Sequence, residues 1–347
     1  MTRAGTVTVA GKPNAGKSTL LNRLVGQKLS ITSDKPQSTR DRVVGIRTDG
    51  DTQMILADTP GLLDPSYLLQ TAMQSAAVSA LRDADCIIYV CDARDGIPGP
   101  LNEVAGLESP PRAPTIVALN KSDLLHRRER DTLAQALPDA IFISALTGDG
   151  FPALIAAVES HLPESPFLFP VEDVSIHSVR FLAAELIRET ALEQLGAEVP
   201  YSVACEIDEF REDRSPIYIR AIIHVERDSQ KRILIGEKGK RIKLLGTAAR
   251  KKIETLVGAT VYLDLGSKYC RIGERTQRHS AASVTPHTTE ANMPLAPQLL
   301  EILVCPKCKG PLDYNEAEGA LTCQRDKLKY PVRDGIPIML IDEATPV

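Results

Sequence analysis

The sequence has no run of about 18 consecutive apolar residues, and this absence argues against a helix that spans a membrane. A strand-like apolar run begins at Val7, which leaves too little sequence before it for a signal peptide. Cysteine is sparse, and Cys86, Cys91 and Cys205 lie in apolar runs where buried thiols are expected, as in a reducing compartment. These features predict a cytoplasmic protein.

An excess of either charge is also missing. The chain carries 41 Lys and Arg residues against 45 Asp and Glu residues, a formal net charge of −4. Composition therefore does not predict nucleic-acid binding, and a basic surface of that kind has to be local. At 347 residues, 43% of them hydrophobic, the chain is long enough for two or three domains.

The pattern of apolar residues divides the chain into successive segments. Residues 1–165 alternate short apolar strands with amphipathic helices, as in a doubly wound α/β sheet. Residues 166–173 form a Pro-rich linker. Residues 174–270 predict a smaller α+β domain, with a helix at 174–195, strands at 202–206 and 217–225, two helices, and a strand at 260–265. Residues 271–297 lack periodicity and predict disorder, whereas residues 298–343 predict a compact tail.

A glycine-rich loop, Gly-Lys-Pro-Asn-Ala-Gly-Lys-Ser, joins the first strand to a helix, which is the arrangement that binds nucleotide phosphates. Its glycines allow backbone N–H groups to face the β-phosphate, Lys17 can span the β and γ oxygens, and the Ser18 hydroxyl can reach Mg²⁺. The expected phosphate-binding residues are Gly11, Asn14, Ala15, Gly16, Lys17, Ser18 and Thr19.

A second motif follows the apolar strand at residues 54–57. Asp58 stands at the end of that strand, where its carboxylate would hold Mg²⁺, and Gly61 follows in the next turn.

Two further strand ends carry residues that would bind the base. In Asn120-Lys121-Ser122-Asp123, the Asp123 carboxylate can accept the N1–H and 2-amino hydrogens of guanine, which adenine does not offer. Backbone N–H groups at Ser144 and Ala145 would bind the guanine carbonyl oxygen. Each of these motifs, taken alone, is commonly no more than the polar end of a strand. Their order along the ligand-binding edge of a parallel sheet nevertheless predicts a site for GTP and GDP.

The second domain contains a strongly basic stretch around a glycine loop. Between residues 231 and 252 there are nine Lys and Arg residues and one acidic residue, Glu237. This local excess of positive charge favours phosphate binding. A solvated charged face is the simplest alternative. Here a Gly-x-x-Gly loop joins two helices, and the elements of the domain follow in the order helix, strand, strand, helix, helix, strand. This arrangement is typical of a bacterial-type KH domain that binds RNA. The expected RNA-binding residues are Gly236, Glu237, Lys238, Gly239, Lys240 and Arg241.

Together, residues 5–270 resemble the Era family of GTPases, which join a Ras-like P-loop GTPase domain to a KH domain. The resemblance is carried by residues 11–22, 30–33, 37–40 and 43–46. It implies GTP hydrolysis, binding to small-subunit ribosomal RNA near its 3′ end, and a role in maturation of the small ribosomal subunit. It also implies a monomer, and it leaves open a peripheral contact with the inner face of the cell membrane.

The resemblance also assigns roles to single residues. Thr39 is implied to be the switch threonine that meets Mg²⁺ when the γ-phosphate is present, and Asp58 and Gly61 to sense that phosphate, so the implied catalytic set is Lys17, Thr39, Asp58 and Gly61. Leu62 stands where Ras-like enzymes carry a glutamine that orients water, which predicts slow unaided hydrolysis. Asn14 matches the asparagine of relatives that bind K⁺ beside the phosphates.

The tail contains a possible metal site of its own. Cys305 and Cys308, followed by Cys323 and Asp326, have the spacing of a zinc ribbon with a carboxylate in the fourth position. Residues 299–306 and 330–337 resemble the small bacterial Trm-type family, which is related to zinc-ribbon proteins that activate methyltransferases. A small metal-free fold is the alternative to zinc, and no partner of the tail follows from the sequence.

Two alternatives to a hydrolysing switch remain at this point. One is a nucleotide-gated RNA-binding assembly factor whose own hydrolysis is negligible without the ribosome. The other is a tRNA-modification GTPase with a similar phosphate loop, although a KH pattern after a single GTPase domain argues against it.

Overall fold

The computed structural model describes residues 1–33, 35, 38–63, 65, 68–195, 203–225, 227–269, 304–308, 310–315, 320–333, 336–337 and 344–346. Two compact units are present, Met1–Cys270 and Arg271–Val347, and each is described by itself. The stretch 271–297, for which disorder is predicted, lies outside the described residues, as does Gln37. In the part of the chain that is described, no helix is long and apolar enough to cross a membrane.

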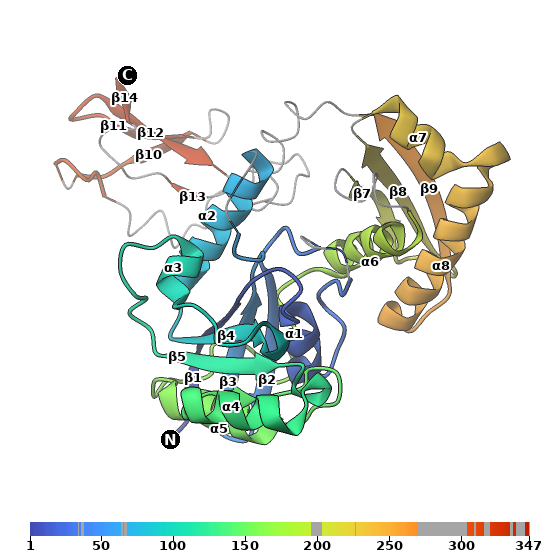
Figure 1. Ribbon diagram of the computed structural model, residues 1–347. Coiled ribbons are helices and arrows are strands. Elements are labelled where there is room, and N and C mark those ends of the chain that lie inside the picture. Colours follow the sequence, from blue (N-terminus) through green and yellow to red (C-terminus); the bar gives the residue numbers. More distant parts are fainter. Residues whose placement is uncertain are drawn as a thin grey trace. The chain divides into compact units, whose positions relative to one another are not determined.

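The first unit begins with a sheet whose strand order is β2-β3-β1-β4-β5-β6 (Figure 1). Strand β2 is antiparallel to β3, and the other neighbours are parallel. The strands span Arg3–Ala10 (β1), Val43–Asp49 (β2), Thr52–Asp58 (β3), Cys86–Asp92 (β4), Thr115–Asn120 (β5) and Ile141–Phe142 (β6). Because β1, β3, β4, β5 and β6 all run in the same direction, their carboxyl ends meet at one edge of the sheet.

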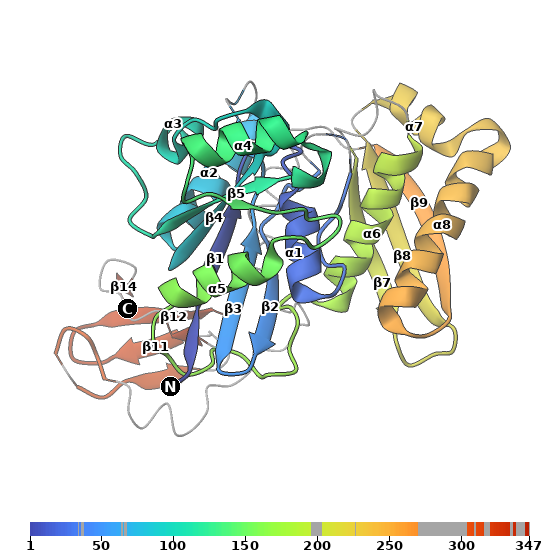
Figure 2. The same ribbon diagram turned by 60° about the horizontal axis from the view of Figure 1, so that its bottom comes forward.

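Helices cover both faces of this sheet (Figure 2). One apolar core contains residues of α1 and α5 together with β1, and a second contains residues of α2, α3 and α4 together with β4. The helices span Lys17–Val25 (α1), Leu68–Arg82 (α2), Leu101–Ala105 (α3), Arg127–Ala136 (α4) and Phe151–His161 (α5). Cys86 and Cys91 are buried as expected, whereas Cys205 is only half-buried. The predicted doubly wound α/β fold is confirmed.

The chain then runs along the outer strands of the sheet before the second fold begins. The Gln53 side chain accepts hydrogen bonds from the backbone N–H groups of Leu168 and Phe169, at 2.8 and 3.0 Å. Further on, the backbone N–H of Ile46 donates to the carbonyl of Val174, at 2.8 Å. The stretch predicted as a linker is therefore hydrogen-bonded to β3, and Val174, the residue after it, is hydrogen-bonded to the edge strand β2.

The second fold has the predicted order α6-β7-β8-α7-α8-β9, with a three-stranded sheet in the order β7-β8-β9. Helices α6 and α8 pack on one face of this sheet (Figure 1). Between α7 and α8 lies a short 3₁₀ turn, Glu237–Gly239. The elements span Val179–Gln194 (α6), Ala204–Arg211 (β7), Ile217–Val225 (β8), Asp228–Ile235 (α7), Lys240–Val257 (α8) and Val261–Tyr269 (β9).

Helix α6 begins five residues later than predicted, at Val179 rather than at residue 174. Ser175 is held by β2 instead, because its hydroxyl donates to the carbonyl of Val44 at 2.6 Å. The Ser178 side chain then caps the helix by accepting from the backbone N–H of Phe181, at 3.2 Å. Apolar spacing alone does not distinguish this extended segment from a first helical turn.

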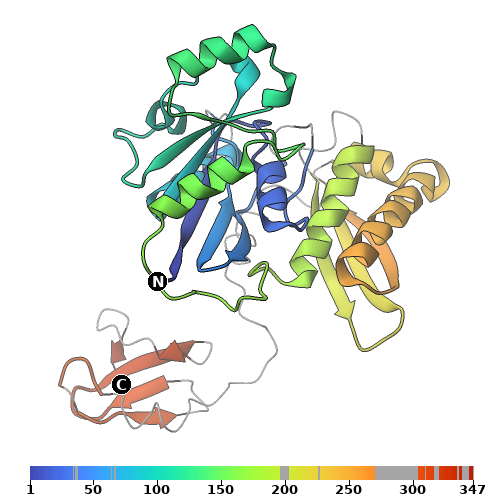
Figure 3. The same cartoon turned by 90° about the horizontal axis from the view of Figure 1, so that it is seen from below.

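The second unit is made of short strands (Figure 3). Among its described residues, β11 pairs with β10 and β12, and β12 also pairs with β13 and β14. A small core joins Cys305, Leu321, Cys323 and Tyr330. The strands span Asp313–Asn315 (β10), Ala320–Cys323 (β11), Leu328–Arg333 (β12), Ile336–Pro337 (β13) and Thr345–Pro346 (β14).

Candidate functional site

The loops that follow β1, β3, β4 and β5 meet at the carboxyl edge of the first sheet. Val9 of β1 lies beside Asp58 of β3, and Asp92 of β4 lies beside Asn120 of β5. The phosphate loop, Asp58 and the Asn120-Lys121-Ser122-Asp123 loop therefore follow strands β1, β3 and β5 at one edge of the sheet, as the order of motifs predicts.

Two glycines of the phosphate loop occupy positions that a larger residue cannot fill. Gly11 has φ +152°, and an added Cβ would lie 2.1 Å from the carbonyl oxygen of Val90. Gly16 has φ +98°, and its Cβ would lie 2.2 Å from the Asn120 amide nitrogen. The loop is thus pressed against both β4 and the base-binding loop, which fixes the direction of its backbone N–H groups.

Three oxygen ligands predicted for Mg²⁺ converge behind the phosphate loop. The Ser18 hydroxyl donates to Asp58 Oδ2 at 2.7 Å and lies 3.0 Å from the Thr39 hydroxyl. The Thr39 hydroxyl also donates to Asp58 Oδ2, at 3.3 Å, although 19 residues separate the two. Thr39 therefore already lies at the cluster, in the position expected of a switch threonine that reaches the metal.

The second carboxylate oxygen of Asp58, Oδ1, is further evidence for a cation-binding site beside Ser18 and Thr39. Asp58 is completely buried, and its Oδ1 accepts no hydrogen bond from the described residues. Burial raises the pKa of the Asp58 carboxyl, and the Lys17 ammonium and the neighbouring hydroxyls oppose that shift without cancelling it. Burial likewise lowers the pKa of Lys17, against the charge of Asp58. A buried carboxylate oxygen that accepts no hydrogen bond from the described residues, together with two neighbouring hydroxyls, is a set of oxygen ligands that suits Mg²⁺.

The base-binding loop is tied to the phosphate loop by Asn120. Its amide donates to the carbonyl of Ala15 at 2.8 Å, and its Oδ1 accepts from the backbone N–H of Ala145 at 2.8 Å. Asp123 is exposed in the following turn, and Ser144 is completely buried. A hollow of about 370 Å³ opens between α1, with the residues that follow it, and the loop after β6. Its lining includes Thr19, Thr32, Ala145 and Leu146.

Leu62 has no role in orienting water in this arrangement. Its side chain is 2% exposed and belongs to the core between the sheet and α2. Its backbone N–H donates to the carbonyl of Gly11, at 3.0 Å. At Gly61, an added Cβ would lie 2.8 Å from Pro13, so the start of the second switch packs directly on the phosphate loop.

Three residues that hold the site together were missed from the sequence. Ser30 donates to Asp58 Oδ2 at 2.6 Å, and Asn22 of α1 fixes Ser30 by accepting from its backbone N–H at 2.8 Å. Arg23, also on α1, donates to the carbonyls of Leu146 and Thr147, at 2.7 and 2.5 Å. Asn22 and Ser30 lie inside the stretches that carry the Era resemblance, but Arg23 has no recognisable signal because its partners lie 123 and 124 residues away.

The first switch region also contacts the second fold of the same unit. Glu189 on α6 is completely buried, accepts from the backbone N–H of Thr32 at 3.0 Å, and pairs with Lys28 and Lys252 at 2.8 and 2.9 Å. Burial raises the pKa of Glu189, but its lysine partners outweigh that effect and hold the pKa below its ordinary value. Arg40 donates to the carbonyl of Val203 at 2.8 Å. The segment that carries Thr39 thus has partners in both folds.

The glycine loop of the second fold lies at the surface. Glu237, Lys238, Lys240 and Arg241 are exposed, and Gly236, Lys238 and Gly239 all have positive φ. A Cβ at Gly236 would lie 2.7 Å from Arg241 Cβ, whereas one at Gly239 would meet nothing within 4 Å. The loop therefore presents open backbone and several basic side chains at the start of α8, an arrangement suited to phosphates.

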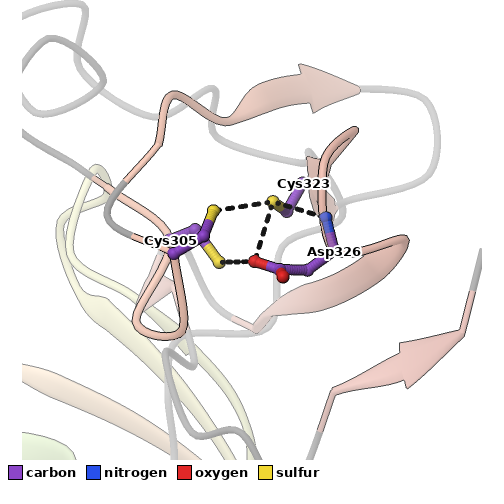
Figure 4. A group of neighbouring side chains, drawn as sticks. Cys305, Cys323 and Asp326 are labelled. Carbon is purple, nitrogen blue, oxygen red and sulfur yellow. Dashed lines mark hydrogen bonds between the residues drawn. The ribbon is translucent and has the colours of Figure 1, made fainter.

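In the second unit, the predicted tail ligands come together. One ligand atom from each of Cys305, Cys308, Cys323 and Asp326 lies within 4.8 Å of the others. Figure 4 shows Cys305, Cys323 and Asp326 pointing toward one another. The sulfur atoms of Cys308 and Cys323 are 3.6 Å apart, and Cys305 Sγ is 3.4 Å from Asp326 Oδ2. Tetrahedral zinc with bonds of about 2.0–2.3 Å requires ligand atoms to be this close together.

Family models match three parts of the chain. Residues 6–121 match the model described as 50S ribosome-binding GTPase, residues 198–268 match KH domain, and residues 297–335 match Trm112p-like protein. The KH match after a single GTPase domain argues against a tRNA-modification GTPase.

Curated relatives and solved structures extend the likeness over most of the chain. GTPase Era of Pseudomonas putida is 44% identical over 278 residues, covering 77% of this chain and 91% of the relative, and GTPase Era of Thermotoga petrophila is 42% identical over 274 residues, with the same shares. The structure of an Aquifex aeolicus Era variant bound to GDP·AlF4⁻ is similar at TM-score 0.74 and 36% identity, covering 80% of this chain and 97% of that one. Era in complex with MgGDPNP and nucleotides 1506–1542 of 16S ribosomal RNA is similar at TM-score 0.74 and 35% identity, with the same coverage.

Proposed function

The chain belongs to the Era family of GTPases, and on that premise we propose that it couples GTP hydrolysis at the carboxyl edge of its first sheet to binding of small-subunit ribosomal RNA near the 3′ end. The observation that carries this proposal is the convergence of Ser18, Thr39 and Asp58 behind the phosphate loop. A switch threonine at that cluster responds to the γ-phosphate, because Mg²⁺ joins the phosphate to these oxygens.

We assign the predicted residues the following parts. Lys17 neutralises the β and γ oxygens, Ser18, Thr39 and Asp58 hold Mg²⁺, and Gly61 contacts the γ-phosphate through its backbone. Asp123 accepts from the guanine edge, and the Ser144 and Ala145 backbone contacts the guanine carbonyl. The glycine loop from Gly236 to Arg241 holds the RNA backbone, since it combines exposed backbone at positive φ with basic side chains.

We propose that the parts of the chain divide the work. Residues 1–165 form the GTPase domain, residues 174–270 the KH domain, and residues 298–343 a separate zinc-binding domain, with linkers at 166–173 and 271–297. The protein acts as a monomer in the cytoplasm, where its proposed partner, the assembling small ribosomal subunit, is found. A peripheral contact with the inner face of the cell membrane would be an additional association, and fractionation of cells tests it.

Phosphate release under multiple turnover tests the proposed coupling. Purified protein is expected to hydrolyse GTP slowly, and a fragment of 16S ribosomal RNA that spans the 3′ end is expected to bind more tightly in the presence of a GTP analogue than of GDP. Equal RNA affinity with both nucleotides would contradict the coupling. Turnover absent without ribosomal subunits, but present with them, would favour the assembly factor with negligible intrinsic hydrolysis.

We further propose that K⁺ assists hydrolysis beside Asn14, because Leu62, which stands where Ras-like enzymes carry a glutamine that orients water, is apolar and buried. Turnover is expected to be about tenfold higher in K⁺ than in Na⁺, since an added positive charge stabilises the transition state. Asn14→Ala should remove the difference between the two salts without preventing GDP binding. Equal turnover of the unaltered protein in K⁺ and Na⁺ at matched ionic strength would rule out this role.

In the tail, we propose one Zn²⁺ held by Cys305, Cys308, Cys323 and Asp326. The support is the approach of their ligand atoms to within 4.8 Å and the small size of the surrounding core. Zinc would supply folding stability to a segment with few buried apolar residues.

Elemental analysis of the full chain, purified without chelator, is expected to find one zinc per molecule. Cys323→Ser should lose that zinc and lower the melting temperature of the tail, because a ligand of the folded state is lost. Asp326→Asn should weaken zinc binding by removing the fourth ligand. Asp313→Asn is its matched control and should keep the zinc, since Asp313 is an exposed acid of the same tail whose partner is Gln324. A folded tail with reduced cysteines and no zinc would favour the metal-free fold instead.

A further inference from the structure

Asp92, at the end of β4, lies between the phosphate loop and the base-binding loop without belonging to either. Its register partner is Asn120, the first residue of the base-binding loop. The Asp92 side chain is 10% exposed, so its carboxylate lies largely outside solvent. A carboxylate that is largely removed from solvent needs strong partners, and here it has two.

The partner that matters for binding is Lys121. The Lys121 ammonium donates to Asp92 Oδ2 at 2.7 Å and to the carbonyl of Asn14 at 2.8 Å. Lys121 has φ +62°, which turns the residue out of the strand and lets its side chain return toward the phosphate loop. Asn14 lies 107 residues earlier in the sequence, so this one ammonium group fastens the base-binding loop to the phosphate loop.

The second partner, Arg94, holds the carboxylate in position. Its guanidinium donates to both oxygens of Asp92, at 3.0 and 2.7 Å, and its backbone N–H donates to Oδ1 at 3.1 Å. Burial raises the pKa of Asp92, but the hydrogen bonds from Arg94 and Lys121 outweigh burial and hold the pKa well below its usual range. The carboxylate therefore stays charged toward Lys121 at neutral pH.

We propose that Asp92 is a positioning residue for guanine-nucleotide binding, acting through Lys121 to fix the base-binding loop against the phosphate loop. The inference rests on the proposed nucleotide site and names a residue that the sequence motifs did not include. When the two loops are already held in the arrangement that binds the nucleotide, the nucleotide binds more tightly, because less conformational entropy of the loops is lost on binding. Asp92 touches neither phosphate nor guanine in this role, so its loss weakens GTP and GDP equally and leaves the choice of base unchanged.

The test measures the dissociation constants of fluorescent GDP and of a non-hydrolysable GTP analogue. Asp92→Asn, which keeps the shape and removes the charge, should raise both constants about tenfold to a hundredfold, the range for a lost hydrogen bond between charged groups. Single-turnover hydrolysis at saturating GTP should keep its rate, because the contact is the same in the ground state and the transition state. Arg94→Ala leaves Lys121 paired with Asp92 and keeps the donation from the backbone N–H of residue 94 to Oδ1, so it should raise both constants by less than Asp92→Asn does.

A double-mutant cycle with Lys121→Met separates positioning from a general loss of stability. If Asp92 acts through Lys121, the double variant should bind no more weakly than the weaker single variant. Lys121→Met breaks the same ion pair from its more exposed side, so the pair can be assessed even if Asp92→Asn fails to fold. Additive effects in the cycle, or unchanged constants in Asp92→Asn, would overturn the inference. Failure of the unaltered protein to bind GDP or GTP would instead overturn the proposed nucleotide site.

Discussion

Asp123→Asn is expected to move the preference of the nucleotide site from GTP to XTP. In the proposed site, the Asp123 carboxylate accepts two hydrogens from guanine. Xanthine has a carbonyl oxygen where guanine has its 2-amino group, so an amide suits xanthine better. Each guanine hydrogen left without an acceptor costs about 1–3 kcal/mol, or roughly tenfold to a hundredfold in affinity. The measurement compares dissociation constants for GDP and XDP, and turnover of GTP and XTP.

The substitution keeps the shape of the side chain, and Asp123 is exposed, so the fold should not change. The backbone of the turn is held independently, since the N–H of Ser122 donates to the carbonyl of Ile143 at 3.1 Å. ITP, which lacks the 2-amino group, provides a control on the unaltered protein and should bind more weakly than GTP. Full GTP affinity in Asp123→Asn, with no gain for XTP, would show that another residue selects the base.

Gly239→Asp is expected to abolish RNA binding and to leave GDP affinity unchanged. The added carboxylate would project from the glycine loop, where it would repel the RNA phosphates and obstruct the approach of the RNA backbone. A Cβ at Gly239, the N-cap of α8, meets nothing within 4 Å, and although φ +76° strains any residue other than glycine, aspartate tolerates this conformation better than most. Gel-shift or anisotropy titration with the ribosomal RNA fragment measures the loss.

The same helix offers a closely matched control at its other end. Gly258 caps the C-terminus of α8 with φ +68°, against φ +76° at Gly239, and its added Cβ also meets nothing within 4 Å. Gly258→Asp therefore introduces the same charge and the same backbone strain away from the loop, and RNA affinity should be retained. Equal loss of RNA binding in both variants would indicate a general effect of charge or folding. Unchanged affinity in Gly239→Asp would place the RNA site elsewhere in the chain.

Local chemistry made a large part of this protein predictable from its sequence. The phosphate loop, Asp58, the Asn120 to Asp123 motif and the glycine loop at Gly236 each require particular residue types within a few positions. Their order between apolar segments also predicted both folds of the first unit. The start of α6 could not be predicted, because the competing partner of Ser175 is a carbonyl of β2 that lies 131 residues away.

The sequence by itself therefore determined the loops to which we assign phosphate, guanine and RNA binding, because the backbone conformation and hydrogen-bonding groups of those loops are encoded locally. Only the tertiary structure decided what holds them in place. Ser30 at Asp58, Arg23 at Leu146, Asp92 at Lys121 and Glu189 at Thr32 join residues between 28 and 157 positions apart. Contacts of this kind depend on how the sheet brings strands together, and no short stretch of sequence contains both partners.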